Sequence, residues 1–159
     1  MNGINTKYWL VILVVVAIGG FGYLIWDEYF NPEYLDEFAK FEKQYVQAMT
    51  ADTYGGSTPQ ATLDLFIDAL KKEDADLAAK YFMLDDNLSR DKWIEALGEM
   101  KAKGLLDDMA RDLEKAKPDL EGKIDENDFK FAIFDNGVLS NLIDMQFNTY
   151  SKVWKIENL

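Results

Sequence analysis

The longest uncharged stretch of the chain runs from residue 8 to residue 26 and reads YWLVILVVVAIGGFGYLIW. At ~1.5 Å of rise per residue, a helix of this length covers about 28 Å, close to the ~30 Å hydrocarbon core of a bilayer. Aromatic residues that favour the membrane interface stand at both ends of the stretch, namely Tyr8, Trp9, Tyr23 and Trp26. The pattern predicts a transmembrane helix over residues 8–26.

Charges beside this helix predict its orientation. Lys7 precedes the span, whereas Asp27 and Glu28 follow it, and positive charge favours the cytoplasmic side. We therefore expect a single-pass signal anchor in the cytoplasmic membrane, with a cytoplasmic tail of residues 1–7 and an extracytoplasmic remainder. The alternative is a cleaved secretory signal, because Gly20-Phe21-Gly22 has the small-x-small pattern of a cleavage site. The length of the apolar stretch favours the retained anchor.

Residues 27–50 predict an amphipathic helix next to the membrane. Pro32 suits a first helical position, and apolar residues then recur in steps of four and three at Tyr34, Phe38, Phe41, Tyr45 and Ala48. This stripe predicts either a docking face for a partner protein or a homodimer through residues 33–49, or a face that packs on its own domain. Packing on its own domain is favoured, because two heptads are too short for an independent coiled coil.

A linker over residues 51–57 separates this helix from the main domain, because Gly55-Gly56 prevents helix continuation. The domain of residues 58–159 begins with helical periodicity. Ser57 or Thr58 and Asp74 are the expected N-caps of its first two helices, and Ser89 is expected to open a longer helical stretch. Gly104 interrupts the last helical stretch, and Pro118 is expected to close the helical half. The apolar positions that face the core are expected at Leu63, Phe66, Ile67, Leu70, Leu77, Ala78, Tyr81, Phe82, Trp93, Ile94, Leu97, Met100, Leu105, Leu106, Met109 and Leu113.

After Pro118 the period changes from 3.6 to 2, which predicts strands. Residues 129–134 and 142–147 alternate on either side of Asp135-Asn136-Gly137, a strong hairpin turn signal. Residues 153–156 form the last expected strand, with Trp154 and Ile156 on one face. Helices followed by an antiparallel meander predict an α+β domain, in which the helices pack on a small antiparallel sheet.

Composition excludes several classes of function. The net charge of −12 disfavours binding to nucleic acid or to anionic lipid headgroups. The chain has no cysteine and no histidine, which rules out disulfides, thiol nucleophiles, lipid attachment at a cysteine and histidine-based catalysis. The acidic run of residues 125–128 lacks the spacing of a calcium loop. We therefore expect no metal site and no cofactor.

The segment from residue 57 to residue 82, STPQATLDLFIDALKKEDADLAAKYF, resembles the opening of the nuclear-transport-factor-like (cystatin-like α+β cone) superfamily. The ending of residues 153–156, VWKI, is similar to the last strand of many such domains, which also occur as membrane-anchored versions in bacteria. The resemblance implies a curved antiparallel sheet closed by helices over an apolar pocket. Fewer strands are expected here than in the full family fold, so the expected form is a trimmed cone.

Together these patterns predict a membrane-anchored extracytoplasmic binding or interaction module without catalytic activity. The residues expected to bind a ligand or partner are Phe38, Phe41, Tyr45, Tyr81 and Trp154.

Two alternatives stay open. One is a structural subunit of a cell-envelope complex that docks through residues 33–49. The other is a small isomerase or cyclase-like enzyme, in which a buried Asp144 abstracts a proton and Tyr81 or Tyr150 donates to an enolate oxygen. Strand alternation disfavours the enzyme, because it places Asp144 opposite Ile143 and Met145 and therefore towards water.

Overall fold

The computed structural model describes Tyr23, residues 32–119 and residues 126–159. Apart from Tyr23, the predicted anchor of residues 8–26 and the tail of residues 1–7 lie outside the described residues. Within the described part of the chain, no helix is both long and apolar enough to cross a membrane. The transmembrane helix therefore stays a prediction.

The chain divides into two compact units, residues 1–44 and residues 45–159. Helix α2, Pro32–Ala51, contributes to both and has Pro32 as its first residue, as the sequence predicts. Within the second unit, Met49 is buried, and the ring of Tyr45 meets that of Tyr150 edge-on at 5.8 Å. The second unit thus starts inside the helix expected next to the membrane.

Four further helices follow, α3 (Pro59–Lys71), α4 (Ala75–Ala79), α5 (Asp91–Ala102) and α6 (Leu106–Leu113). The predicted caps of α3 and α4 are confirmed, because Thr58 and Asp74 accept hydrogen bonds from the amides of Ala61 and Leu77. Helix α5 begins two residues after Ser89, with Arg90 at the N-cap position. The Ser89 hydroxyl accepts a hydrogen bond from the amide of Asp91, the first helical residue, at 3.0 Å.

The strands form one antiparallel sheet in the order β1 (Lys117–Pro118), β2 (Asp128–Asp135), β3 (Val138–Asn148) and β4 (Val153–Asn158). The predicted α+β class and meander are confirmed. Asn136 and Gly137 both have positive φ, 51° and 82°, as the expected hairpin turn requires. Pro118 lies in a short edge strand rather than simply ending the helical half, a position that tolerates a missing amide donor.

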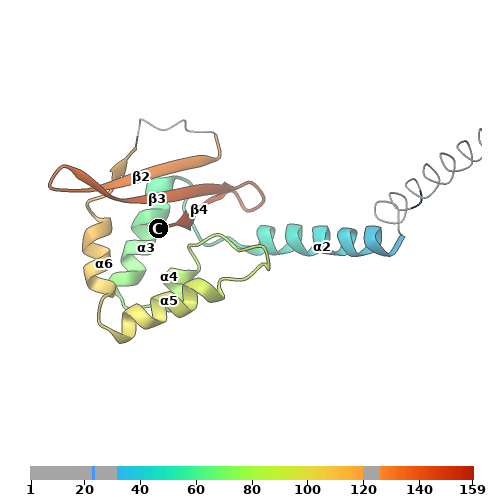
Figure 1. Cartoon of the computed structure of the whole chain (residues 1–159), viewed down its shortest axis with the longest axis horizontal. Helices are drawn as coiled ribbons and strands as arrows, with labels where there is room; N and C mark the ends of the chain where they lie inside the picture. Colours follow the sequence, from blue (N-terminus) through green and yellow to red (C-terminus); the bar gives the residue numbers. More distant parts are fainter. Residues whose placement is uncertain (1–22, 24–31, 120–125) are drawn as a thin grey trace, which may run out of the picture. The chain divides into compact units, whose positions relative to one another are not determined.

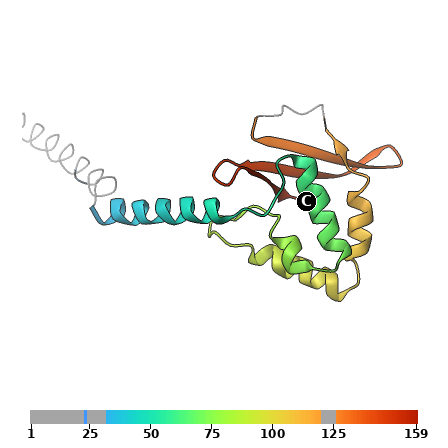
Figure 2. The same cartoon turned by 180° about the vertical axis from the view of Figure 1, so that it is seen from behind.

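Helices α3 to α6 lie on one side of the sheet in both views (Figures 1 and 2). Strand register explains which side chains of the sheet lie together. Met145 pairs with Ile156 and Phe147 pairs with Trp154. Trp154 and Ile156 therefore share one face of β4, as predicted. One core joins the helices to the sheet, and its largest fully buried apolar side chains are Phe66, Phe82, Phe131, Leu63, Leu70, Leu97, Leu106, Ile143, Met145 and Ile156.

Strand β4 is covered by backbone on its outer edge. The amide of Ile156 donates to the Tyr81 carbonyl, and the amide of Met83 donates to the Ile156 carbonyl. Further along, the Trp154 amide donates to the Gly56 carbonyl at 2.9 Å. These bonds hold the linker before α3 and the segment after α4 against the sheet, and they satisfy polar groups that an open edge would expose.

Gly55 makes this close approach feasible. It has φ of 152°, and a Cβ atom at its position would lie 2.3 Å from the Trp154 carbonyl oxygen. Because the contact is to backbone, a side chain there forces the linker away from β4.

Beside this linker lies a buried polar cluster of Lys155, Asp52 and Arg90, referred to here as the Lys155 cluster. The ammonium of Lys155 donates to Asp52 Oδ1 at 2.8 Å and to the carbonyls of Tyr54 and Lys80 at 2.7 and 2.6 Å. Arg90 pairs with the other Asp52 oxygen. All three donors of the ammonium are thereby satisfied.

Burial lowers the pKa of Lys155 to about 8 from its ordinary value of 10.5, and the hydrogen bond and charge of Asp52 only partly oppose this shift. The folded chain therefore releases this proton at a lower pH than the unfolded chain. Between pH of about 8 and 10.5 the unfolded state binds more protons, so the free energy of unfolding rises with pH in that window.

We expect this contribution to be visible in a comparison of the native chain with Lys155→Met. The difference in unfolding free energy between them should grow in favour of the native chain by about 2–4 kcal/mol from about pH 8 to about pH 10.5. Urea titration of the full chain at a series of pH values measures it, with Lys152→Met as the exposed control. A difference that stays flat over this window would contradict the assignment.

The contact at Gly55 gives a second prediction. Gly55→Ala should lower the free energy of unfolding by about 1–3 kcal/mol, because the backbone conformation and the Trp154 carbonyl both oppose a Cβ. The control is Gly98→Ala in α5, where no atom other than those of neighbouring residues and the surrounding helix backbone lies within 4 Å of the new carbon; it should raise the free energy of unfolding by about 0.5–1 kcal/mol. Urea midpoints of the two variants that move in the same direction would refute the close approach.

Candidate ligand-binding pocket

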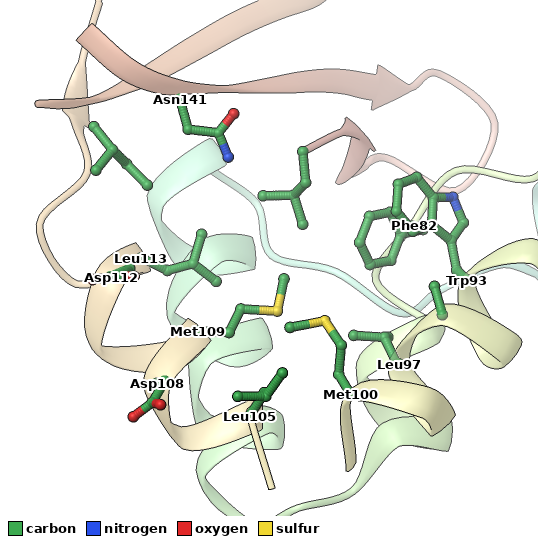
Figure 3. Close-up of a pocket in the computed structure, with 13 residues that line it drawn as sticks. Phe82, Trp93, Leu97, Met100, Leu105, Asp108, Met109, Asp112, Leu113 and Asn141 are labelled. Carbon is green, nitrogen blue, oxygen red and sulfur yellow. The ribbon is translucent and has the colours of Figure 1, made fainter. Parts of the chain in front are cut away.

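A pocket of about 480 Å³ opens between α5, α6 and the sheet (Figure 3). This volume falls in the range of small-molecule sites in proteins. Apolar side chains from the helices, the sheet and the segment after α4 form most of its wall, namely Phe82, Trp93, Ala96, Leu97, Met100, Leu105, Met109, Leu113, Ile133 and Leu159.

The helical part of the wall follows directly from the sequence. Trp93, Leu97 and Met100 recur at i, i+4 and i+7 along one face of α5. Gly104 then takes φ of 70° and ends this helical stretch. Helix α6 follows it and contributes Met109 to the same cavity. In Figure 3 the side chains of Met100 and Met109 extend towards one another from the two helices.

An aromatic stack forms one end of the pocket. The rings of Phe82 and Trp93 lie 3.9 Å apart at an interplanar angle of 18°, and Phe66 meets Phe82 edge-on at 5.3 Å. Phe82 is fully buried, and its carbonyl accepts from Arg90 Nε at 2.6 Å. Arg90, a member of the Lys155 cluster, therefore holds the backbone of this end wall.

Three polar residues complete the lining, Asp108, Asp112 and Asn141. The two carboxylates are more than half exposed and pair with basic residues three positions further along the chain, Asp108 with Arg111 and Asp112 with Lys115. None of the described residues in the lining is basic. The pocket thus offers apolar contact area and negative charge at its rim, and its lining contains no buried acid or base.

Two other hollows have charged linings. One, of about 520 Å³, lies where Lys80, Arg90 and Asp91 meet Leu84 and Ile94. The other, of about 260 Å³, includes Lys71 and Glu114, which form an ion pair across its surface. Since small-molecule sites are mostly apolar with few polar groups, the pocket between α5 and α6 is the stronger candidate.

The residues that the sequence singled out for binding lie outside this pocket. In the first unit, Phe38 and Phe41 are 58% and 47% exposed. In the second unit, Tyr45 packs on Tyr150, and half-buried Trp154 packs on the rings of Phe147 and Phe129.

Tyr81 is buried in the core rather than placed at the pocket. Burial, and then the nearby Tyr54, Asp68 and Asp74, raise the pKa of its phenol.

Asp144, the candidate base, lies on β3 and accepts from Lys130 Nζ at 2.6 Å. Its side chain is 28% exposed, so it lacks the burial that the proton-abstraction hypothesis requires. The hydrogen bond and charge of Asp144 raise the pKa of Lys130, as expected for a surface ion pair. Tyr150, a candidate donor, is 43% exposed. Across residues 32–119 and 126–159, no group of three or more acidic side chains is arranged to hold a metal ion.

Sequence reasoning assigned the pocket residues to the core. Trp93, Met100 and Met109 do pack against the core, but they are only half-buried. The available signal was the pair of methionines on consecutive helices, because flexible thioethers are common at adaptable binding surfaces.

Comparison of the chain with family models, with curated proteins and with solved structures finds no match.

Proposed function

We propose that this chain is a non-catalytic binding module that holds a small apolar molecule in the pocket between α5, α6 and the sheet. The observation that carries the proposal is the composition of the pocket wall, because ten of its thirteen lining residues are apolar and only Asp108, Asp112 and Asn141 are polar. An apolar cavity of this size favours an apolar ligand, because binding removes the apolar surface of the ligand from water. The resemblance to the nuclear-transport-factor-like superfamily implies the same kind of pocket.

The proposal includes the place where binding occurs. The apolar stretch of residues 8–26 and the charges on either side of it support a single-pass anchor, with residues 27–159 outside the cytoplasmic membrane. A domain held at a membrane surface has direct access to apolar molecules that partition into the bilayer.

The residues that line the pocket are suited to binding a ligand rather than to catalysing a reaction on it. A general acid or base needs a titratable group within hydrogen-bond reach of the reacting atoms. Within the described part of the chain, the titratable side chains of the lining are Asp108 and Asp112, which are largely exposed and ion-paired.

Methionine methyl NMR of the full chain in lipid nanodiscs tests ligand binding. Two of the six methionines, Met100 and Met109, line the pocket, whereas Met49 and Met145 are buried elsewhere. Titration with decanol should shift the signals of Met100 and Met109 and leave those of Met49 and Met145 in place. Equal shifts at all four, or none at any, would contradict the proposal.

A matched pair of alanine variants supplies the control for this experiment. Ala96 lines the pocket, whereas Ala102 lies on the same helix, is exposed and does not line it. Ala96→Phe should weaken decanol binding at least about tenfold, because the ring takes up volume that the ligand needs. Ala102→Phe should leave binding unchanged, and a similar loss in both variants would count against the pocket.

A second candidate function, docking of a protein partner through residues 33–49, is favoured by a separate observation. Leu35 and Phe38 on α2 are 50% and 58% exposed, and exposed apolar side chains that cluster on one face mark contact sites. This would suit a structural subunit of an envelope complex.

Site-specific photo-crosslinking in intact cells distinguishes this second candidate. A photoreactive amino acid in place of Phe38 should give a discrete adduct with one protein. The control is the same substitution at Lys40, which lies on another side of α2 and pairs with Asp36. Equal labelling from both positions, or no adduct from position 38, would remove this candidate.

A further inference from the structure

The charge of the pocket lining is of one sign. Among the residues that the structure describes, Asp108 and Asp112 are its only charged side chains, and they lie one helical turn apart on one face of α6. Building on the proposed function, we propose that the ligand is a cationic amphiphile, whose apolar body fills the pocket and whose amine or ammonium group lies against these two carboxylates.

A ligand cation at the rim can be met by both carboxylates, because each belongs to the pocket lining and each side chain is more than half exposed and so is able to turn. In Figure 3 the Asp108 carboxylate points away from the methionines, whereas the Met109 side chain extends from the same helix towards Met100. Their present partners, Arg111 and Lys115, do not line the pocket. These pairs are exposed, with about 60% of each basic side chain accessible, and such pairs contribute little to stability. A bound cation therefore displaces or joins them at small cost.

The charge of the whole chain favours the same class of ligand. With a net charge of −12, the protein attracts cations and repels anions on approach. A fatty acid or an anionic lipid would bring a carboxylate or phosphate to a rim that holds two carboxylates and no lining base. Like charges brought together in this way lower affinity, so an anionic headgroup is disfavoured.

The apolar end of the ligand has a matching wall. Met100 and Met109 extend into the cavity from both helices, and the Phe82–Trp93 stack closes one end. Thioethers adapt to alkyl chains or rings of different shape. The wall therefore selects for an apolar ligand body but does not select one particular shape.

The test compares three amphiphiles with the same ten-carbon chain, decylamine, decanol and decanoate, bound to the full chain in zwitterionic nanodiscs. Each is used below its critical micelle concentration, and the Met100 and Met109 methyl signals report binding. The native chain should bind decylamine most tightly and decanoate least tightly. Raising the salt concentration should reduce the difference in affinity between decylamine and decanoate, because salt screens exposed charges.

Asp107 provides the matched control on the same helix. It has the same charge as Asp108 and lies next to it, but it does not line the pocket. Asp108→Asn should reduce the preference for decylamine over decanol by about two- to fivefold, and the double change with Asp112→Asn by about tenfold. Asp107→Asn should preserve most of the preference. Partitioning of each amphiphile into lipid is the same for all variants, so it cancels in this comparison.

The outcomes separate this inference from the function on which it rests. Shifts at Met100 and Met109 with all three amphiphiles at similar affinity would retain the pocket and overturn the cationic ligand. The cationic ligand is also overturned if Asp107→Asn removes the preference as fully as Asp108→Asn, since the effect would then be one of overall charge. Absence of shifts with any amphiphile would overturn both.

Discussion

The arrangement of this domain depends on how β4 is held on its outer edge. Lys155 has no exposed surface, and its ammonium joins the end of α2, through Asp52, to the linker at Tyr54 and to the end of α4 at Lys80. An ammonium buried in this way is stabilised only while each of its donors has a partner. Three segments that are distant in sequence, namely residues 52–54, the end of α4 at Lys80 and β4 at Lys155, are therefore fixed at a single point.

The pocket is built outward from that point. Asp52 also pairs with Arg90, and Arg90 holds the carbonyl of Phe82. On either side of Phe82, the carbonyl of Tyr81 and the amide of Met83 pair with Ile156 of β4. With its backbone held from two directions, Phe82 presents its ring to Trp93 at the start of α5. The buried ion pair thus positions the end wall of a cavity whose remaining walls come from the apolar faces of α5 and α6.

Periodicity was sufficient to predict the helices, the hairpin turn at Asn136-Gly137 and the antiparallel meander, because each is determined by neighbours in sequence. It could not predict the Lys155 cluster. Lys155 occupies the polar position between Trp154 and Ile156, where alternation alone indicates solvent, and its partner Asp52 lies 103 residues away. The resemblance implied an apolar pocket, but its location between α5 and α6 could not be predicted from the sequence, for a related reason. The same apolar stripe on α5 is expected whether the facing helix fills the space or leaves a cavity, and only the packing of α6 decides between them. The binding residues predicted from the sequence, among them Tyr81 and Trp154, were chosen because they are aromatic. The sequence does not show which aromatic side chains border a cavity.

The central claim is that the cavity between α5, α6 and the sheet accommodates an apolar molecule with its polar end at the rim. A crystal structure of the full chain with decylamine tests this most directly. We expect an alkyl chain between Met100 and Met109, with its nitrogen within hydrogen-bond distance of Asp108 or Asp112. Density for the ligand at another surface, or a cavity closed by collapse of Met109 onto Leu97, would contradict the claim.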